Sequence, residues 1–314
     1  MTNQILKNYG EKRYYSLDYY LKQTYGEKLY KLSLNGGMTC PNRDGTLGTK
    51  GCIFCSAGGS GDFASSPGKS ITEQIQDGKT LVSRKYSGHS YIAYFQAFTN
   101  TYAPVEYLEK IFMEAIEEPE VKILSIATRP DCLSEDILNL LERLNRIKPV
   151  WVELGLQTIH EESARFIRRG YELPVFETAV TNLRRIGVEV IVHVILYLPE
   201  ETEKMMLDTI SYLNHQDIQG IKLQLLHILK GTDLAISYEK HHFRLPSLEE
   251  YVVLLGKCIS ILRPDIVIHR LTGDGPKEIL IAPKWTGNKR QVLNTIQKYL
   301  KDRDIRQGKE YRNV

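Results

Sequence analysis

Residues 35–55, NGGMTCPNRDGTLGTKGCIFC, place Cys40, Cys52 and Cys55 in a C-x11-C-x2-C array. The loop is rich in Gly, Asn, Asp and Pro, which supply the tight turns that let a chain fold back on itself. We therefore predict that the three thiolates meet at one point as metal ligands. Structural zinc usually has four protein ligands, whereas an iron–sulfur cube with three leaves one iron open. A zinc knuckle, or a disulfide with a spare thiol, is the alternative.

Composition sets the class of protein. The 314 residues are 42% apolar and 25% charged, as in ordinary globular proteins with one large domain or two small ones. No segment approaches the roughly 18 apolar residues of a membrane helix, and the N-terminus has no hydrophobic signal segment. We expect a cytoplasmic protein without a membrane partner. Cys132 and Cys258 lie in or beside apolar segments and are expected to be buried small hydrophobic residues.

Charge divides unevenly along the chain. Residues 284–314 hold nine Lys or Arg against three acidic residues, and residues 1–31 hold six against three, although the whole chain carries only +3. The ends are therefore basic and the middle acidic, a pattern that predicts a patch for a polyanion. Several tyrosines stand beside cations in residues 1–28, as in sites that bind unpaired bases. Solvated ends, and tyrosines that pack a helix onto the core, are the alternatives.

Hydrophobic periodicity predicts alternating strands and helices. The predicted strands are residues 29–34, 90–96, 122–127, 150–156, 188–196, 220–226 and 265–271. The predicted helices are residues 70–86, 104–117, 134–147, 174–186, 201–214, 247–262 and 288–300, and two of them open with the capping boxes Ser70–Glu73 and Ser247–Glu250.

This alternation predicts the α/β class with a parallel sheet. Six βα units and an extension are too few for a closed eightfold barrel, so we expect a partial, open (βα)6 TIM-like barrel. The predicted organisation is a basic, Tyr-rich segment at 1–28, the barrel at 29–235 and a C-terminal βα extension at 236–314 that ends in a basic helix.

Candidate ligand-binding residues follow the strands, because ligands gather at the carboxyl ends of parallel strands. The candidates are Gln96, Thr99, Asn100, Arg129, Glu153, Gln157, Lys222, Gln224, His227, Arg270 and Asp274. Glu153 and Gln157 share one face of an extended strand. Lys222 faces the interior and needs an anionic partner. Arg129 has two possible roles, to bind an anionic ligand or to pair with Asp131. His227 is either a proton donor or a structural residue.

The cysteine loop resembles that of the YhcC-type branch of the radical S-adenosylmethionine (SAM) superfamily. The segments TRPD at 128–131, RLTGD at 270–274 and PKW at 283–285 extend the resemblance to the radical SAM domain of the Elongator catalytic subunit. The resemblance implies a barrel of the radical SAM type. It also implies a 4Fe–4S cluster on the three cysteines, SAM at the fourth iron, a 5′-deoxyadenosyl radical, and a reductase or flavodoxin as the electron donor.

The resemblance also assigns roles. It implies cofactor binding by Gln96, Thr99, Asn100, Arg129, Glu153, Gln157 and Gln224, with Lys222, Arg270 and His227 as catalytic candidates. There are departures from the family pattern. Gln-Ala-Phe at 96–98 replaces Gly-Gly-Glu, and Tyr197 and Glu200 stand where relatives carry glycine.

The resemblance implies tRNA as the partner and its wobble uridine as the target. One group of the branch, called MnmL, converts the carboxymethylaminomethyl side chain to aminomethyl, and a companion tRNA methyltransferase then methylates the product. A radical SAM enzyme that acts on a protein or small metabolite is one alternative. A non-catalytic iron–sulfur or zinc binding module is the other.

Overall fold

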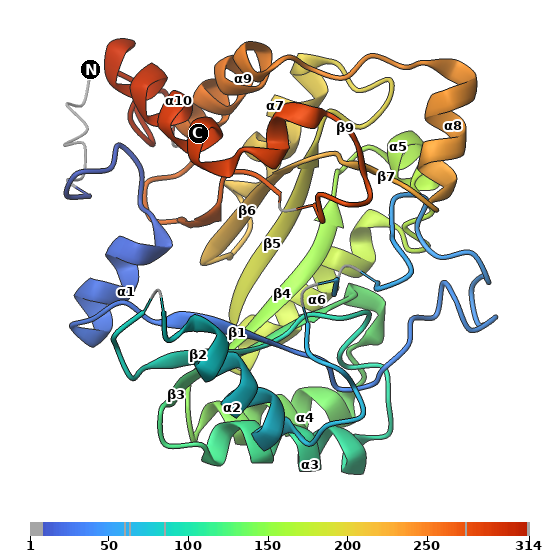
Figure 1. The fold of residues 1–314 in the computed structure, drawn as a ribbon, viewed down its shortest axis with the longest axis vertical. Coiled ribbons are helices and arrows are strands. Elements are labelled where there is room, and N and C mark those ends of the chain that lie inside the picture. Colours follow the sequence, from blue (N-terminus) through green and yellow to red (C-terminus); the bar gives the residue numbers. More distant parts are fainter. Residues whose placement is uncertain (1–8, 60, 63, 85, 274, 313–314) are drawn as a thin grey trace.

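Seven parallel strands form one curled sheet at the centre of the structure (Figure 1). This computed structural model describes residues 9–59, 61–62, 64–84, 86–273 and 275–312. In sheet order, the strands are β1 (Tyr30–Leu34), β2 (Tyr91–Phe95), β3 (Val121–Thr128), β4 (Val150–Gln157), β5 (Glu189–Leu196), β6 (Gly220–Leu225) and β8 (Val267–Arg270). The strand predicted at 265–271 therefore joins the main sheet beside β6. Two short antiparallel strands, β7 (Ile228–Leu229) and β9 (Leu280–Ala282), form a separate pair that was not predicted.

Contacts across the sheet show how strongly it curls. Lys222 on β6 donates a hydrogen bond to the Tyr94 hydroxyl on β2, with 3.1 Å between nitrogen and oxygen. Four strand spacings separate these strands, which would put them about 19 Å apart in a flat sheet. The strands therefore wrap around a common interior and leave it open between the edge strands β1 and β8. The predicted partial TIM-like barrel is confirmed.

Helices connect the strands and bury one face each. The helices are α1 (Leu17–Tyr25), α2 (Ile71–Val82), α3 (Val105–Glu117), α4 (Glu135–Asn145), α5 (Glu161–Phe166), α6 (Leu173–Arg185), α7 (Glu203–Leu213), α8 (Asp233–His241), α9 (Leu248–Ile261) and α10 (Lys289–Asp302). Both predicted capping boxes are present: the backbone N–H of Ser70 donates to the Glu73 carboxylate, and that of Ser247 donates to Glu250. In the described ranges, no helix is both long and apolar enough to cross a bilayer.

An apolar plug closes the bottom of the barrel, at the amino ends of the strands. Its members are Leu21, Leu29, Ile92, Ile123, Trp151 and Ile191. Tyr20 and Tyr25 of the N-terminal segment pack against this plug, whereas Tyr14 packs in the main core. Tyr15 contacts the rings of Tyr9, Tyr19 and Tyr20, and the Tyr20 ring lies 6.2 Å from Trp151. These tyrosines therefore pack α1 onto the barrel, which was the alternative to base stacking.

The two ends of the chain are joined to each other and to β8. The Gln307 side chain accepts a hydrogen bond from the Tyr15 backbone at 2.8 Å, and the Gln307 backbone donates to the Arg13 carbonyl at 2.9 Å. The Arg13 guanidinium pairs with Asp304 at 2.6 Å. Ile268 on β8 donates its N–H to the Tyr15 carbonyl at 2.7 Å. The two basic ends predicted from the sequence thus lie side by side.

Candidate active site

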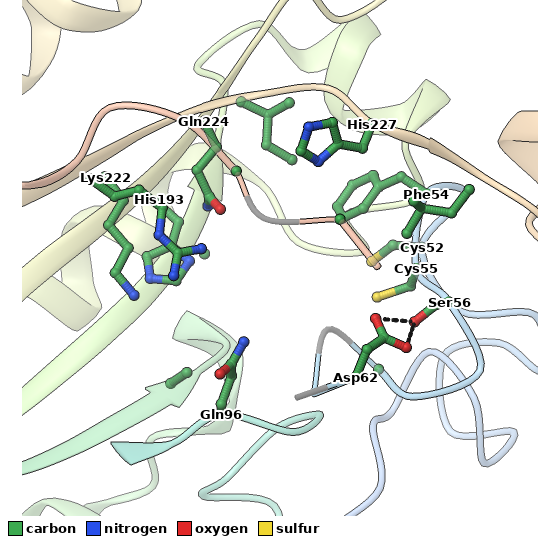
Figure 2. Close-up of a pocket in the computed structure, with 18 of the residues that line it drawn as sticks. Cys52, Phe54, Cys55, Ser56, Asp62, Gln96, His193, Lys222, Gln224 and His227 are labelled. Atoms are coloured by element: carbon green, nitrogen blue, oxygen red, sulfur yellow. Dashed lines mark hydrogen bonds between the residues drawn. The ribbon is translucent and has the colours of Figure 1, made fainter. Parts of the chain in front are cut away.

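A cavity of about 1100 Å³ lies inside the curl of the sheet and reaches the carboxyl ends of the strands. Cys40, Cys52 and Cys55 line it, as do inward-facing residues of the strands. Figure 2 shows Cys52 and Cys55 across the cavity from Lys222 and His193. The cavity thus lies where parallel α/β folds bind their ligands, and it places the three thiols opposite charged groups.

The cysteine loop is held by the side chains of Asn42 and Arg43. The Asn42 amide donates to the Arg168 carbonyl at 2.7 Å and to Cys52 Sγ at 3.4 Å. The Arg43 guanidinium donates to the Ser56 carbonyl at 2.6 Å. A second apolar cluster anchors Ile53 of this loop against Ile167, Leu198, Leu226, Ile228 and Leu234. These contacts hold the loop against the wall of the cavity.

The chemistry of the three thiols fits an iron–sulfur cube. All five cysteines are free, so this structure contains no disulfide. Burial and the neighbouring Cys55 raise the pKa of Cys52 to about 12, so this thiol keeps its proton at neutral pH until a metal displaces it. Among the described residues, no three His, Cys, Asp or Glu side chains are placed to hold a single metal ion. Cys40, Cys52 and Cys55 line the cavity from one loop, and Cys52 interacts electrostatically with both of the other thiols. In a cube each thiolate binds a different iron.

Each strand of the sheet contributes one polar side chain to a layer deep in the barrel, which we call the polar layer. In sheet order, its members are Lys31, Tyr94, Ser125, Glu153, His193, Lys222 and Arg270. The strand register pairs Tyr94 with Ser125, His193 with Lys222, and Lys222 with Arg270. The apolar plug supplies the next inward-facing residues below, such as Trp151 beneath Glu153. The polar layer therefore lies directly above the apolar plug.

Glu153 is the centre of the polar layer, and its side chain is 0% exposed. Its Oε1 accepts hydrogen bonds from Lys31 Nζ at 2.7 Å and Ser125 Oγ at 2.8 Å. Its Oε2 accepts from Lys222 Nζ and from His193 Nε2, the latter at 2.7 Å. Glu153 was predicted to bind the cofactor, but both of its carboxylate oxygens accept hydrogen bonds from protein side chains. Lys222 was predicted to need an anionic partner, and in the structure it pairs with this carboxylate.

Burial and charge shift the pKa values of these groups. Burial would raise the pKa of Glu153, but Lys222 and Lys31 hold it well below its usual range. Burial lowers the pKa of Lys222, and Lys31 and Arg270 repel its charge further. Burial and repulsion from Lys222 lower the pKa of His193 to about 4. The His193 ring is therefore neutral at pH 7, and its Nε2–H donates to the carboxylate.

We expect His193 to make the folded state less stable in acid. Its pKa is about 4 in the folded protein and 6.5 as a free side chain, so between these values the unfolded chain takes up a proton that the folded chain does not. The free energy of unfolding should fall by up to about 3 kcal/mol as the pH drops through this range. Urea unfolding at pH 7 and pH 4.5 would measure it. The variant His193→Gln should lose this part of the pH dependence, and the exposed-site control His215→Gln should keep it. Equal pH dependence in the wild type and His193→Gln would contradict the assignment.

Most of the side chains predicted from the strand ends do line the cavity. Those found there are Gln96, Thr99, Arg129, Gln157, Gln224, His227 and Arg270. Asn100 is buried in the wall instead, where its amide donates to the carbonyls of Phe95 and Ala127 at 3.1 and 2.8 Å. This places Asn100 in a structural role between β2 and β3, contrary to its predicted role in cofactor binding.

Two further predictions concern charged residues at the strand ends. Arg129 donates two hydrogen bonds to Asp131, at 2.9 and 2.7 Å, so its pairing alternative is the one observed. Its guanidinium also lies 5.3 Å from the ring centre of Tyr171. Asp274 falls outside the described residues.

Several non-glycine residues near the cavity have left-handed backbone conformations. Phe98 and Gln157 line the cavity with φ values of 60° and 65°. Such conformations are uncommon and gather at functional sites. Tyr197 and Glu200, which stand where glycine was expected from the family, have φ values of 63° and 66°. The backbone there keeps a glycine-like path even though both residues carry a side chain.

Four members of the polar layer were not predicted from the sequence. Lys31, Tyr94, Ser125 and His193 lie within strands, whereas the candidates were mostly sought just after them. The available signal was that every strand, although mostly apolar, carries a polar residue in phase with its inward face. Because a buried polar group needs partners, seven such residues on neighbouring strands predict one shared network.

Comparisons with known proteins agree with this site. The model of the radical SAM superfamily matches residues 40–213, and that of the Radical_SAM C-terminal domain matches residues 218–302. The chain is 45% identical over 304 residues to the uncharacterized protein YtqA of Bacillus subtilis, covering 97% of this chain and 94% of that protein. It is 35% identical over 286 residues to protein YhcC of Escherichia coli, covering 91% of each.

Two more distant matches connect the chain to Elongator-like proteins. A tRNA uridine(34) acetyltransferase of Methanocaldococcus infernus is 26% identical over 186 residues, or 58% of this chain and 34% of that protein. The solved structure of the archaeal M. infernus Elp3 shares the fold, with a TM-score of 0.67 at 16% identity over 89% of this chain and 64% of that one. The family matches show that this chain belongs to the radical SAM superfamily, in the family of YhcC and YtqA, and radical SAM proteins use a 4Fe–4S cluster and SAM.

Proposed function

We propose that this radical SAM enzyme modifies the wobble uridine of tRNA, converting its carboxymethylaminomethyl side chain to aminomethyl. The bond between the nitrogen and the carboxymethyl group breaks, and the two carbons leave as a two-carbon oxo acid. SAM would be the two-electron oxidant, and water would supply the new carbonyl oxygen. When bound, the cluster and SAM supply a radical that takes a hydrogen atom from an unactivated carbon. Cys40, Cys52 and Cys55 would hold the cluster. The task of the remaining residues is to bind the RNA, to position the reacting carbon and to exclude water.

The observation that carries the proposal is a basic surface that begins at the mouth of the cavity. Lys277, Lys289 and Arg290 line the cavity, and Lys289 and Arg290 also form the first turn of α10. Arg290, Lys298 and Lys301 lie within about 80° of one another around α10, at 100° per residue. Cations in the first turn of a helix are unfavourable, because the positive end of the helix dipole repels them. A bound phosphate would offset this repulsion. A strand of RNA could thus follow α10 to the cavity.

The distant relatives support uridine in tRNA as the target. The archaeal relative is named for acetylation of tRNA uridine 34, and it matches 58% of this chain. That match covers only 34% of the relative, so the acetylation itself is not carried over. Radical chemistry on the side chain of the same uridine is the activity that this chain would share with it.

A direct assay tests the proposal. Reconstituted protein, SAM and a reductant are incubated without oxygen with tRNA that carries the carboxymethylaminomethyl group, and the tRNA is digested to nucleosides. We expect the aminomethyl nucleoside to appear and the starting nucleoside to disappear, with no change in tRNA that lacks the group. An unchanged nucleoside, together with formation of 5′-deoxyadenosine on another substrate, would favour the metabolite or protein alternative.

Binding to tRNA is expected to depend on salt through α10. If Arg290 and Lys298 each contact a phosphate, Arg290→Glu with Lys298→Glu should lower the slope of log Kd against log salt by about 1.5. Affinity should fall for all tRNA sequences alike, because phosphate contacts carry no sequence information. The matched control is Lys204→Glu on α7, whose side chain is exposed and pairs with Asp208. Equal slopes for the double variant and the control would place the RNA elsewhere.

A further inference from the structure

The imidazole ring of His193 is held in one orientation by Glu153. Its Nε2 lies 2.7 Å from Glu153 Oε2. An ionised carboxylate only accepts hydrogen bonds, so the neutral ring carries its proton on Nε2 and a free lone pair on Nδ1. Among the described residues, none forms a hydrogen bond with Nδ1, and this nitrogen is not one of the fully buried polar atoms that lack a partner. The Nδ1 lone pair is therefore accessible.

The cavity reaches this ring. His193 lies in the middle of β5 and lines the cavity, and its side chain is 20% exposed. Its neighbour in the register of β4 is Gly155, which lines the cavity and has no side chain to cover the ring. Gln224 on β6 lines the cavity too, and its amide forms no hydrogen bond in the described part of the chain. In Figure 2, Gln224 and His193 lie across the cavity from Cys52 and Cys55. Water that enters here meets both a nitrogen lone pair and an amide.

The charged groups around His193 are less suited to take up a proton. The side-chain nitrogens of Lys31, Lys222 and Arg270 are donors in their charged forms, and both lysines already donate to Glu153. The Glu153 carboxylate accepts four hydrogen bonds, and its pKa is well below its usual range. Burial and repulsion from Lys222 lower the pKa of His193 to about 4, so its ring is unprotonated at pH 7. His193 thus offers the cavity a neutral nitrogen base.

The proposed reaction needs such a base once the substrate has been oxidised. With SAM as the two-electron oxidant, loss of a hydrogen atom and a further electron from the carboxymethyl carbon beside the nitrogen leaves an iminium, C=N⁺. Water forms a bond to this carbon and must give up a proton. The carbon–nitrogen bond then breaks, and the nitrogen takes up a proton and also receives the proton of the new hydroxyl group. The products are the aminomethyl group, as an ammonium, and the oxo acid. One base that accepts the first proton and returns it serves both steps.

We infer that His193 is the catalytic base of this hydrolysis, with Glu153 as its positioning residue and Gln224 as a second partner of the water. The inference rests on the proposed function. Nδ1 takes a proton from water as the oxygen–carbon bond forms, and it returns that proton to the nitrogen as the carbon–nitrogen bond breaks. Attack on a cationic carbon makes the bound water strongly acidic, so a weak base is sufficient.

Trapping the iminium tests this role. Reconstituted protein, SAM, reductant and tRNA with the carboxymethylaminomethyl group react for a single turnover. Cyanoborodeuteride then reduces any iminium to the starting nucleoside with one deuterium, and 5′-deoxyadenosine counts the hydrogen abstractions. In His193→Gln the amide can still donate to Glu153, but no basic nitrogen remains. We expect more trapped iminium per 5′-deoxyadenosine, and decay of the iminium about 100-fold slower than in the wild type.

Free imidazole separates base catalysis from a structural role. His193→Ala leaves space for the ring, so added imidazole should restore fast decay of the iminium, whereas His193→Gln fills that space and should respond little. The matched control is His215→Gln, at an exposed histidine, which should behave as the wild type. A melting curve for each variant checks folding. Decay at the wild-type rate in His193→Gln, or a folded His193→Ala protein that imidazole does not rescue, would overturn the inference. If His193→Ala does not fold, the decay in His193→Gln decides alone.

A second arm separates this inference from the proposed function. If the wild type leaves the modified nucleoside unchanged, the tRNA proposal fails, and the accessible base is tested by itself. Diethyl pyrocarbonate acylates unprotonated imidazole nitrogens that it can reach, and mass spectrometry of the peptides locates the product. At about pH 5.5 an ordinary histidine is mostly protonated and reacts slowly. Modification of His193 at this pH would retain it as a base for a different substrate, and an unmodified His193 would reject it.

Discussion

Alanine at any one of Cys40, Cys52 or Cys55 is expected to abolish SAM cleavage and to prevent assembly of a stable four-iron cluster. The three thiols come from one loop and line one cavity, and each would bind a different iron, so two cannot replace the third. Anaerobic reconstitution followed by iron and sulfide analysis, visible absorption and measurement of 5′-deoxyadenosine would check this. Activity should fall to the background of the assay.

The other two cysteines are the matched controls. Cys258 is fully buried in α9, as predicted, whereas Cys132 is only partly buried, contrary to the prediction. Cys132 borders a smaller cavity of about 480 Å³ beside the cysteine loop. Cys132→Ala and Cys258→Ala should both keep the cluster and most of the SAM cleavage. A folded Cys258→Ala protein without a cluster would show that the ligand set is wrong. Colourless protein with one zinc ion bound to the loop would reject the radical chemistry altogether.

Glu153→Gln is expected to cause the largest loss of stability of any single change in the polar layer. Glutamine keeps the shape of the side chain but removes the charge that balances Lys31 and Lys222. Breaking a buried ion pair from one side costs about 3–5 kcal/mol, because the remaining charge is buried without compensation. Denaturant unfolding at pH 7 would measure the change, with anaerobic purification to keep the cysteines reduced.

Two comparisons make that experiment specific. The double variant Glu153→Gln with Lys222→Met should recover part of the loss, because it removes one of the uncompensated cations. Glu109→Gln on α3 removes an exposed partner of Arg143 and should cost less than about 1 kcal/mol. If Glu153→Gln is as stable as the wild type, the carboxylate does not balance the lysines in solution.

The sequence was a good guide to the fold because its strands are long enough to show a pattern. Strands buried on both faces are nearly continuous apolar runs, and helices of three turns repeat their apolar residues at helical spacing. The capping boxes at Ser70 and Ser247 then located two helix starts within a residue. The strand pair β7 and β9 has two and three residues, too few to show any period, and only the fold brings its two strands together.

The site was less predictable because its residues come from different strands and meet only inside the folded barrel. Cys40, Cys52 and Cys55 are close in sequence, so spacing alone grouped them. The partners of Glu153 come from β1, β3, β5 and β6, and no local pattern connects them. The candidates were mostly residues just after the strands, and they included Gln96 and His227, which do line the cavity. This choice missed four members of the polar layer, which lie within the strands: Lys31, Tyr94, Ser125 and His193.

The junction between Gln307 and the Arg13–Tyr15 segment has a consequence for how the protein is made. Tyr15 and Gln307 are 292 residues apart in the sequence, so Tyr15 is synthesised long before Gln307. The two hydrogen bonds between Gln307 and this segment therefore cannot form until all of the strands of the barrel have been synthesised. Contacts of such long sequence separation form slowly, so the amino-terminal segment must wait while the intervening βα units fold in order.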